Sequence, residues 1–195
     1  MTKQFSFAEF DPPPPRLTDR LFYAVFPDAA AAERIAQRAS HFCADYGVKG
    51  KPLEAGRLHA TLHHLGDYAG EPPPDVVAAA LKAAAAIAAA PFDVTFDRIT
   101  SSGRSRGSPL VLCGRDGVAE LMAFQGILGA AMIRNWLRDK LKPRFTPHVT
   151  LLYGEHDLRD QAVEPLGWTV REFVLIRSLF GQTRHIVLGR WPLLG

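Results

Sequence analysis

The chain has few of the features that mark secreted or membrane-spanning proteins. Its 195 residues hold two cysteines, Cys43 and Cys113, too few for a disulfide framework. Residues 1–15 lack the apolar segment that a secretory signal requires. The most apolar run, residues 83–90, is about half as long as a helix needs to cross a bilayer. We therefore expect a cytoplasmic protein that does not enter a membrane.

An excess of charge of either sign is also nearly absent. Lys and Arg total 23 and Asp and Glu total 20, so the formal net charge is +3. This small excess permits an anionic ligand without requiring one. Hydrophobic residues make up 47% of the chain and charged residues 22%, which is ordinary for a globular domain with a sizeable core.

Proline is concentrated near the N-terminus, where residues 12–15 are all proline. Proline cannot donate a backbone hydrogen bond, and such a run favours polyproline II. We therefore interpret residues 1–19 as a flexible tail and 20–195 as the folded domain. Apolar periodicity there predicts an α+β order of strands and helices. The expected strands are 20–26, 57–65, 92–100, 109–113, 146–153, 168–180 and 184–193, and the expected helices 28–47, 76–90 and 117–141.

A short motif occurs twice, as His59-Ala60-Thr61-Leu62 and as His148-Val149-Thr150-Leu151. With this composition, chance predicts roughly 0.3 His-x-Thr sequences, and roughly 0.04 once Leu must follow. Each copy lies on a predicted strand after a predicted helix, which suggests a weak internal repeat. Side chains alternate along a strand, so the His and Thr of each copy share one face. The intervening Ala or Val and the following Leu should point into the core.

Two imidazoles and two hydroxyls in one cleft suit phosphodiester chemistry. Histidine titrates near neutral pH, so one ring can accept a proton while the other donates one. Threonine hydroxyls can donate hydrogen bonds to phosphate oxygens. A single such motif is more often a structural histidine in a buried hydrogen bond. The pair favours catalysis by His59 and His148.

The motifs and their surroundings resemble a known family. RLFYAVFPD (20–28) resembles its opening strand, KPLEAGRLHATLHHLG (51–66) its first motif, RFTPHVTLLYG (144–154) its second, and LIRSLFGQTRHIVLGRWPL (175–193) its closing hairpin. This family is the two-histidine (2H) phosphoesterases, in particular the RNA 2′,3′-cyclic phosphodiesterases, long called 2′-5′ RNA ligases. The resemblance covers nearly everything from Arg20 onward.

The resemblance implies a two-lobed, pseudo-duplicated α+β fold, with antiparallel sheets lining a central cleft and helices outside. It implies hydrolysis of RNA 2′,3′-cyclic phosphate ends to 2′-phosphates, with 2′-5′ RNA ligation as the reverse reaction. The substrate would be an RNA or nucleotide cyclic phosphate, and neither a metal nor a nucleotide cofactor would be needed. His59 and His148 match the catalytic positions, and Thr61 and Thr150 the phosphate-binding positions. His148 would be the base and His59 the acid. We expect a monomer.

Two positions depart from the pattern that the bacterial RNA enzymes commonly show. Tyr153 stands where they carry Arg, and His64 stands where they carry Phe. Both departures affect the expected substrate more than the expected reaction.

Four further residues are candidate substrate contacts. Alternation places His63 on the face of His59, where it either reaches substrate at the cleft edge or is simply solvated. Alternation sends His64 to the opposite face, so a metal site of these three histidines is not expected. Arg104 and Arg106 lie in a basic loop that either contacts an RNA backbone or is simply solvated. Tyr153 either stacks on a base or belongs to the core.

Two other functions remain open at this point. One is a non-catalytic module that binds single-stranded RNA or nucleotides. The other is a phosphodiesterase for another small cyclic phosphate or for a 2′-5′ linkage. Turnover of cyclic nucleotides separates the first from an enzyme, and the product isomer narrows the second.

Overall fold

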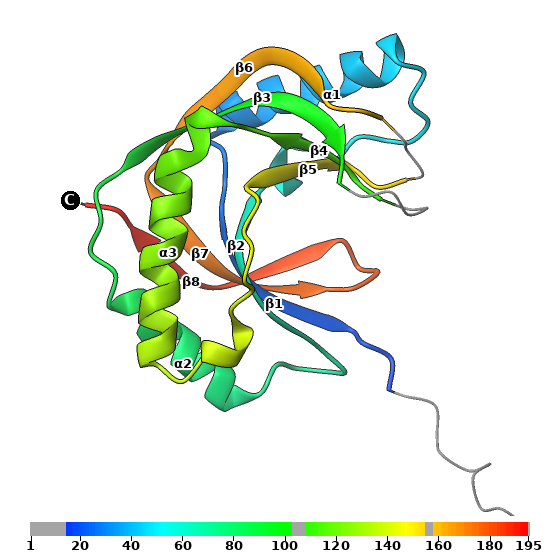
Figure 1. Cartoon of the computed structure of the whole chain (residues 1–195). Coiled ribbons are helices and arrows are strands. Elements are labelled where there is room, and N and C mark those ends of the chain that lie inside the picture. The colour runs from blue at the N-terminus through cyan, green and yellow to red at the C-terminus, as the bar shows by residue number, and fades with distance from the viewer. Residues whose placement is uncertain (1–14, 103–107, 155–157, 195) are drawn as a thin grey trace, which may run out of the picture.

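A single antiparallel sheet organises the protein. Within residues 15–102, 108–154 and 158–194, which the computed structural model describes, eight strands pair in the order β6-β3-β4-β5-β2-β1-β7-β8 (Figure 1). The strands are β1 (Asp19–Val25), β2 (Ala60–Tyr68), β3 (Phe92–Ser101), β4 (Leu110–Cys113), β5 (His148–Leu152), β6 (Gln161–Val170), β7 (Glu172–Leu179) and β8 (Arg184–Pro192). The helices are α1 (Ala29–Asp45), α2 (Pro74–Ala85) and α3 (Ala119–Arg134), with short 3-10 turns η1 (Ala55–Arg57), η2 (Asp116–Val118) and η3 (Arg138–Lys140).

The sheet has two halves that meet at a narrow junction. Strands β6, β3, β4 and β5 form one half, and β2, β1, β7 and β8 form the other. In the described residues, β2 and β5 pair at Ala60 and Val149 alone. The α+β class expected from the sequence is confirmed, although the two expected sheets are joined into one. The internal repeat itself stays a prediction.

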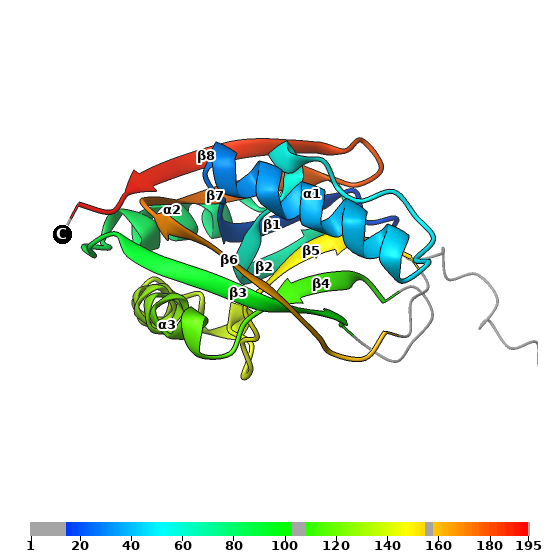
Figure 2. The ribbon, with the colours of Figure 1, turned by 90° about the horizontal axis from the view of Figure 1, so that it is seen from above.

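The three helices cover the sheet in two groups. Asp28 caps α1, because its carboxylate accepts a hydrogen bond of 2.8 Å from the backbone N–H of Ala31. Helix α1 contacts β6 and η1, whereas α2 and α3 pack on each other and α3 also contacts β2 and β3. Figure 2 shows α1 and α3 on opposite sides of β3 and β6 in that view.

Strand β1 is buried on both faces, as its apolar, aromatic-rich sequence predicts. Leu21, Tyr23 and Val25 belong to the main core under the helices. Phe22 and Ala24 point the other way, where they pack with Val174 and Ile176 of β7 in a small second cluster. This second cluster lies on the face that carries the first histidine motif, because the Phe22 ring stacks on His59.

Three predicted boundaries are wrong, the first being the end of α2, which lies at Ala85 rather than at residue 90. Residues 168–180 are not one strand, because β6 ends at Val170 and β7 begins at Glu172. Most of β6 was missed because its sequence holds Pro165 and Gly167, which weaken a strand pattern and are tolerated in an edge strand. Helix α3 ends at Arg134 rather than near 141, and Trp136 follows with a φ of 65°.

Helix α3 is the most apolar helix of the described chain. Together with η2 it spans Asp116–Arg134, 19 residues of mean hydropathy 1.3, which by length and composition alone would suit a membrane span. Its stripe of Leu121, Phe124, Leu128 and Met132 is buried in the core, as the periodicity predicts. The last member of the predicted stripe, Trp136, is 93% exposed instead. The packing of α3 accounts for this stripe, whereas Met122, Ile127 and Ile133 of the same helix are exposed.

Residues 1–14 lie outside the described residues, so most of the expected proline-rich tail is not described. The chain is placed from Pro15, and β1 begins at Asp19, one residue before the predicted start of the folded domain. Thr18 already belongs to this domain, since its N–H donates to the carbonyl of Tyr68 at 2.8 Å.

Candidate active site

The junction of the two half-sheets brings the two motifs side by side. Strands β2 and β5 are antiparallel with Ala60 opposite Val149, so the same register sets His59 opposite Thr150 and Thr61 opposite His148. All four side chains are half-buried. Ala60 and Val149 between them are fully buried, as alternation predicts. The sheet thus collects two imidazoles and two hydroxyls on one face.

The two histidines are anchored in the same way. Nδ1 of His59 lies 2.9 Å from the carbonyl oxygen of Arg57, and Nδ1 of His148 lies 2.8 Å from that of Thr146. A carbonyl oxygen only accepts hydrogen bonds, so each Nδ1 must carry its proton and donate. Each Nε2 is then the nitrogen left to accept or release a proton. In both motifs the backbone two residues earlier sets this tautomer.

The surroundings of His59 are crowded and mostly apolar. Phe22 stacks on its ring with centroids 5.2 Å apart, and Phe26 meets it edge-on at 6.2 Å. Burial lowers the pKa of His59 to about 4, opposed by the hydrogen bond to Arg57 and helped by the positive charges of His185, His148 and Arg57. In the unliganded protein His59 is therefore a neutral imidazole at neutral pH.

A third histidine, His185, stands beside His59. Its ring meets that of His59 edge-on, with centroids 5.3 Å apart and an angle of 81° between the planes. Burial lowers the pKa of His185, and the charge of Arg57 lowers it further. His185 is not among the site residues predicted from the sequence. It lies on β8 opposite Ser178 of β7, and no local pattern shows that the order of strands brings it to the first motif.

The predicted orientations of His63 and His64 are both wrong, because β2 contains irregularities. Tyr23 pairs with His63 but Ala24 pairs with Thr61, so Leu62 is an extra residue and the side chains beyond it exchange faces. His63 is 5% exposed and turned toward α3. Its Nε2 lies 2.9 Å from the carbonyl oxygen of Gln125, and its Nδ1 lies 3.3 Å from the side-chain amide of the same residue. Both ring nitrogens are occupied, which suits a structural histidine.

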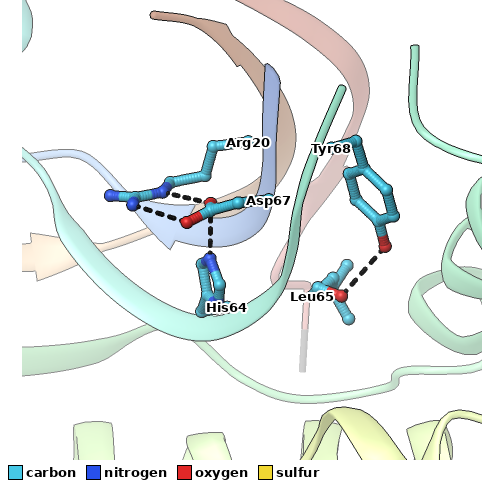
Figure 3. Close-up of polar contacts among 5 residues, drawn as sticks. All are labelled: Arg20, His64, Leu65, Asp67 and Tyr68. Atoms are coloured by element: carbon cyan, nitrogen blue, oxygen red, sulfur yellow. Dashed lines mark hydrogen bonds and ion pairs between the residues drawn. The ribbon is translucent and has the colours of Figure 1, made fainter. Parts of the chain in front are cut away.

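His64 instead lies on the face of the site, in a network with Asp67 and Arg20 (Figure 3). Its Nε2 lies 2.8 Å from Oδ1 of Asp67. Arg20 donates two hydrogen bonds to the same carboxylate, of 2.7 Å to Oδ1 and 2.9 Å to Oδ2. The Arg20 guanidinium, opposed by burial and helped by His64, holds the pKa of Asp67 at about 2. Asp67 is thus the acidic partner that the sequence analysis did not assign to His64.

The histidines near the first motif do not converge. His59, His63 and His64 turn to Arg57, Gln125 and Asp67 respectively. Across the three ranges that the structure describes, no three His, Cys, Asp or Glu side chains gather as metal ligands would.

Two hollows flank the junction, and each contains one histidine of the pair. The His148 hollow, of about 290 Å³, is lined by Thr61, Leu62, His63, His64, Gln125, Lys140, Lys142, Arg144, Phe145, Thr146 and His148. The His59 hollow, of about 330 Å³, is lined by Arg20, Phe22, Leu53, Arg57, His59, Tyr153, Ser178, Leu179, Phe180, Gly181, Thr183 and His185. Tyr153 is 62% exposed, so it is not the core aromatic that was one of its two interpretations. Arg104 and Arg106 lie outside the described residues.

Comparison with known proteins agrees with this arrangement. The profile of the 2′-5′ RNA ligase superfamily matches residues 24–181, and the chain belongs to that superfamily. The RNA 2′,3′-cyclic phosphodiesterase of Escherichia coli (strain K12) is 31% identical over 180 residues, which cover 89% of this chain and 96% of the relative.

Solved structures show the same fold. The apo form of E. coli LigT superposes with a TM-score of 0.69 at 26% identity, covering 92% of this chain and 100% of LigT. E. coli LigT complexed with 3′-AMP gives a TM-score of 0.68 at 27% identity, covering 91% and 99%.

Proposed function

We propose that this protein hydrolyses 2′,3′-cyclic phosphate ends of RNA to 2′-phosphates, with His59 and His148 as the catalytic pair. The observation that carries the proposal is the matched anchoring of the two rings, in which each Nδ1 donates to a backbone carbonyl and each Nε2 is left to accept or release a proton. The relative named RNA 2′,3′-cyclic phosphodiesterase supports the substrate class, and the 3′-AMP complex of E. coli LigT shows that a nucleotide binds that protein.

In the proposed reaction the cyclic phosphate lies between the two motifs. Nε2 of His148 takes a proton from a water molecule, whose oxygen attacks the phosphorus. The bond from phosphorus to O3′ breaks, and Nε2 of His59 gives O3′ a proton, which leaves a phosphate on O2′. The hydroxyls of Thr61 and Thr150 donate to the non-bridging oxygens, where negative charge grows in the transition state. No metal and no cofactor takes part.

The burial of His59 sets a condition on these roles. A neutral imidazole cannot act as an acid, so His59 must gain a proton when the substrate binds. The bound phosphate supplies the reason, because a negative charge beside an imidazole favours its protonated form. Substrate binding should therefore raise the pKa of His59 from about 4.

A panel of substrates tests the function. We expect the purified protein to convert nucleoside 2′,3′-cyclic phosphates, and short RNAs with such ends, to 2′-phosphates identified by ³¹P NMR. Activity should survive exhaustive chelation of divalent metals. A 3′-phosphate product would reverse the direction of ring opening, and loss of activity restored by zinc or manganese would contradict the metal-free mechanism. Binding without any turnover would instead indicate a nucleotide-binding module. The cytoplasmic location and the monomeric state stay predictions.

A further inference from the structure

One cation in the His59 hollow, Arg57, has an Nε without a hydrogen-bond partner among the described residues. Arg57 belongs to η1, its backbone carbonyl orients His59, and the residue lines the hollow. Its Nε is buried and makes no hydrogen bond, and in the described part of the chain its guanidinium pairs with no carboxylate. A buried donor without an acceptor costs about 1–3 kcal/mol, and more when it is charged. Arg57 lines the hollow and its charge has no carboxylate partner among the described residues, so an anion from outside the chain would compensate it.

The other arginine of this hollow, Arg20, is paired with a carboxylate. Arg20 holds Asp67 with two hydrogen bonds, and its guanidinium also lies over the Phe180 ring at 5.0 Å (Figure 3). Its charge is already compensated inside the protein. Arg57 has no such carboxylate, although both side chains line the same space.

Arg57 brings a permanent positive charge to the two histidines of this hollow. Burial lowers the pKa of both His59 and His185, and that charge lowers it further. Without a carboxylate among them, an anion is the ligand that this group would stabilise most. Tyr153 and Phe180, 62% and 38% exposed at the same hollow, offer rings on which a nucleobase can stack.

We infer that the His59 hollow is a second phosphate subsite, in which Arg57 binds the internucleotide phosphodiester next to the cyclic end. The inference rests on the proposed function, which places the reacting phosphate between the two motifs. The ring centroids of His185 and His59 are 5.3 Å apart, so the hollow begins directly beside the proposed catalytic ring. The preferred substrate is then an RNA end of at least two nucleotides, with the one-charge cyclic mononucleotide as a poorer substrate.

The His148 hollow is the weaker candidate for this phosphate. Its Lys142 and Arg144 are exposed, so water already solvates their charges. Its third cation, Lys140, pairs with Asp139 at 3.0 Å. Nothing there matches the buried, unpartnered Nε of Arg57. Arg144 therefore serves as the matched control for Arg57.

The test compares two dinucleotides that end in a 2′,3′-cyclic phosphate. One has a normal phosphodiester between its nucleotides, and the other has an uncharged methylphosphonate. For the unmodified protein we expect kcat/KM to favour the charged dinucleotide by about tenfold, as expected for a hydrogen bond to a charged group. Arg57→Gln should bring this ratio close to one and Arg57→Lys should keep part of it, whereas Arg144→Gln should keep all of it.

Dissociation constants for the same pair, measured in the His148→Ala background so that the ligands persist, separate this inference from the proposed function. The charged dinucleotide could bind more tightly because of Arg57 while the unmodified protein turns over neither dinucleotide. That result would overturn the proposed function and support the subsite. If Arg57→Gln lowers kcat/KM equally for both dinucleotides, Arg57 acts at the reacting phosphate instead. An unchanged ratio in Arg57→Gln, or a ratio abolished by Arg144→Gln, would overturn the subsite.

Discussion

The two histidine motifs share one anchoring hydrogen bond and differ in their surroundings. Both rings donate from Nδ1 to the carbonyl two residues earlier. His59 then packs against Phe22, Phe26 and His185, which come from the first and last strands and the turn after β1. His148 has Cys113 of β4 as its cross-strand neighbour and opens onto a hollow of exposed cations.

The shared hydrogen bond comes from the motif, whereas the different surroundings come from the fold. The His-x-Thr sequence and its strand determine how each ring is held. Strands distant in the sequence bury His59 and so determine how readily this ring gains a proton. The near-symmetry of the motifs is therefore compatible with distinct roles in one reaction.

The largest expected effect tests what the two halves share. His59→Ala and His148→Ala should each lower kcat by at least about a hundredfold, because each removes a general acid or base. Steady-state kinetics on a cyclic mononucleotide would measure the loss, and circular dichroism with a thermal melt would show that each variant is folded. A folded variant with nearly full activity would remove its histidine from the mechanism.

The next prediction separates the two roles. A phosphodiester with a nitrophenolate leaving group needs little help from an acid. On this substrate His59→Ala should therefore recover a large part of its lost kcat, on the order of tenfold or more. His148→Ala should not recover, since attack by water still needs a base. Recovery in His148→Ala alone would exchange the two assignments.

Substitution of the threonines tests the symmetry of the phosphate grip. Thr61→Val and Thr150→Val keep the side-chain shape and remove one donor each, so each should lower kcat/KM by about tenfold. The two losses should be similar, because each hydroxyl lies opposite the histidine of the other motif. Kinetics on one cyclic mononucleotide is the measurement, and Ser at either position should restore most of the activity. A loss confined to one threonine would show that the phosphate is held from one half only.

The titration of His59 tests how the halves differ. In the free protein, NMR should find His59 neutral from pH 7 down to about pH 4, where it gains its proton, since burial lowers its pKa. Inorganic phosphate or a 2′-nucleotide should raise this pKa by about one unit or more, because an anion stabilises the imidazolium. An unchanged pKa in saturating ligand would argue that His59 does not act as the acid.

Much of this site could be predicted from sequence, within a physical limit. His59, Thr61, His148 and Thr150 share a face because strands alternate, and that rule needs only local sequence. His185 could not be found in this way, because its position depends on the order of strands across the sheet. The fold shows the same limit, since the helical stripe of α3 was predicted and the edge strand β6 was largely missed.

The smallest expected effect on catalysis concerns His63, which sequence alternation placed beside His59. The extra residue in β2 turns it toward α3, where both its nitrogens meet Gln125. His63→Leu should therefore change kcat by less than about threefold, while it lowers the free energy of unfolding by about 1–3 kcal/mol by leaving buried groups of Gln125 unpaired. Burial lowers the pKa of His63, so its unfolded form binds protons more readily than its folded form. The stability that His63 contributes is thus complete above the ordinary histidine pKa and falls as the pH drops toward the lowered value. Urea unfolding at pH 7 and pH 5 should show that His63→Leu loses part of this pH dependence. A fall in kcat of a hundredfold would instead return His63 to the reaction and contradict the face on which the structure places it.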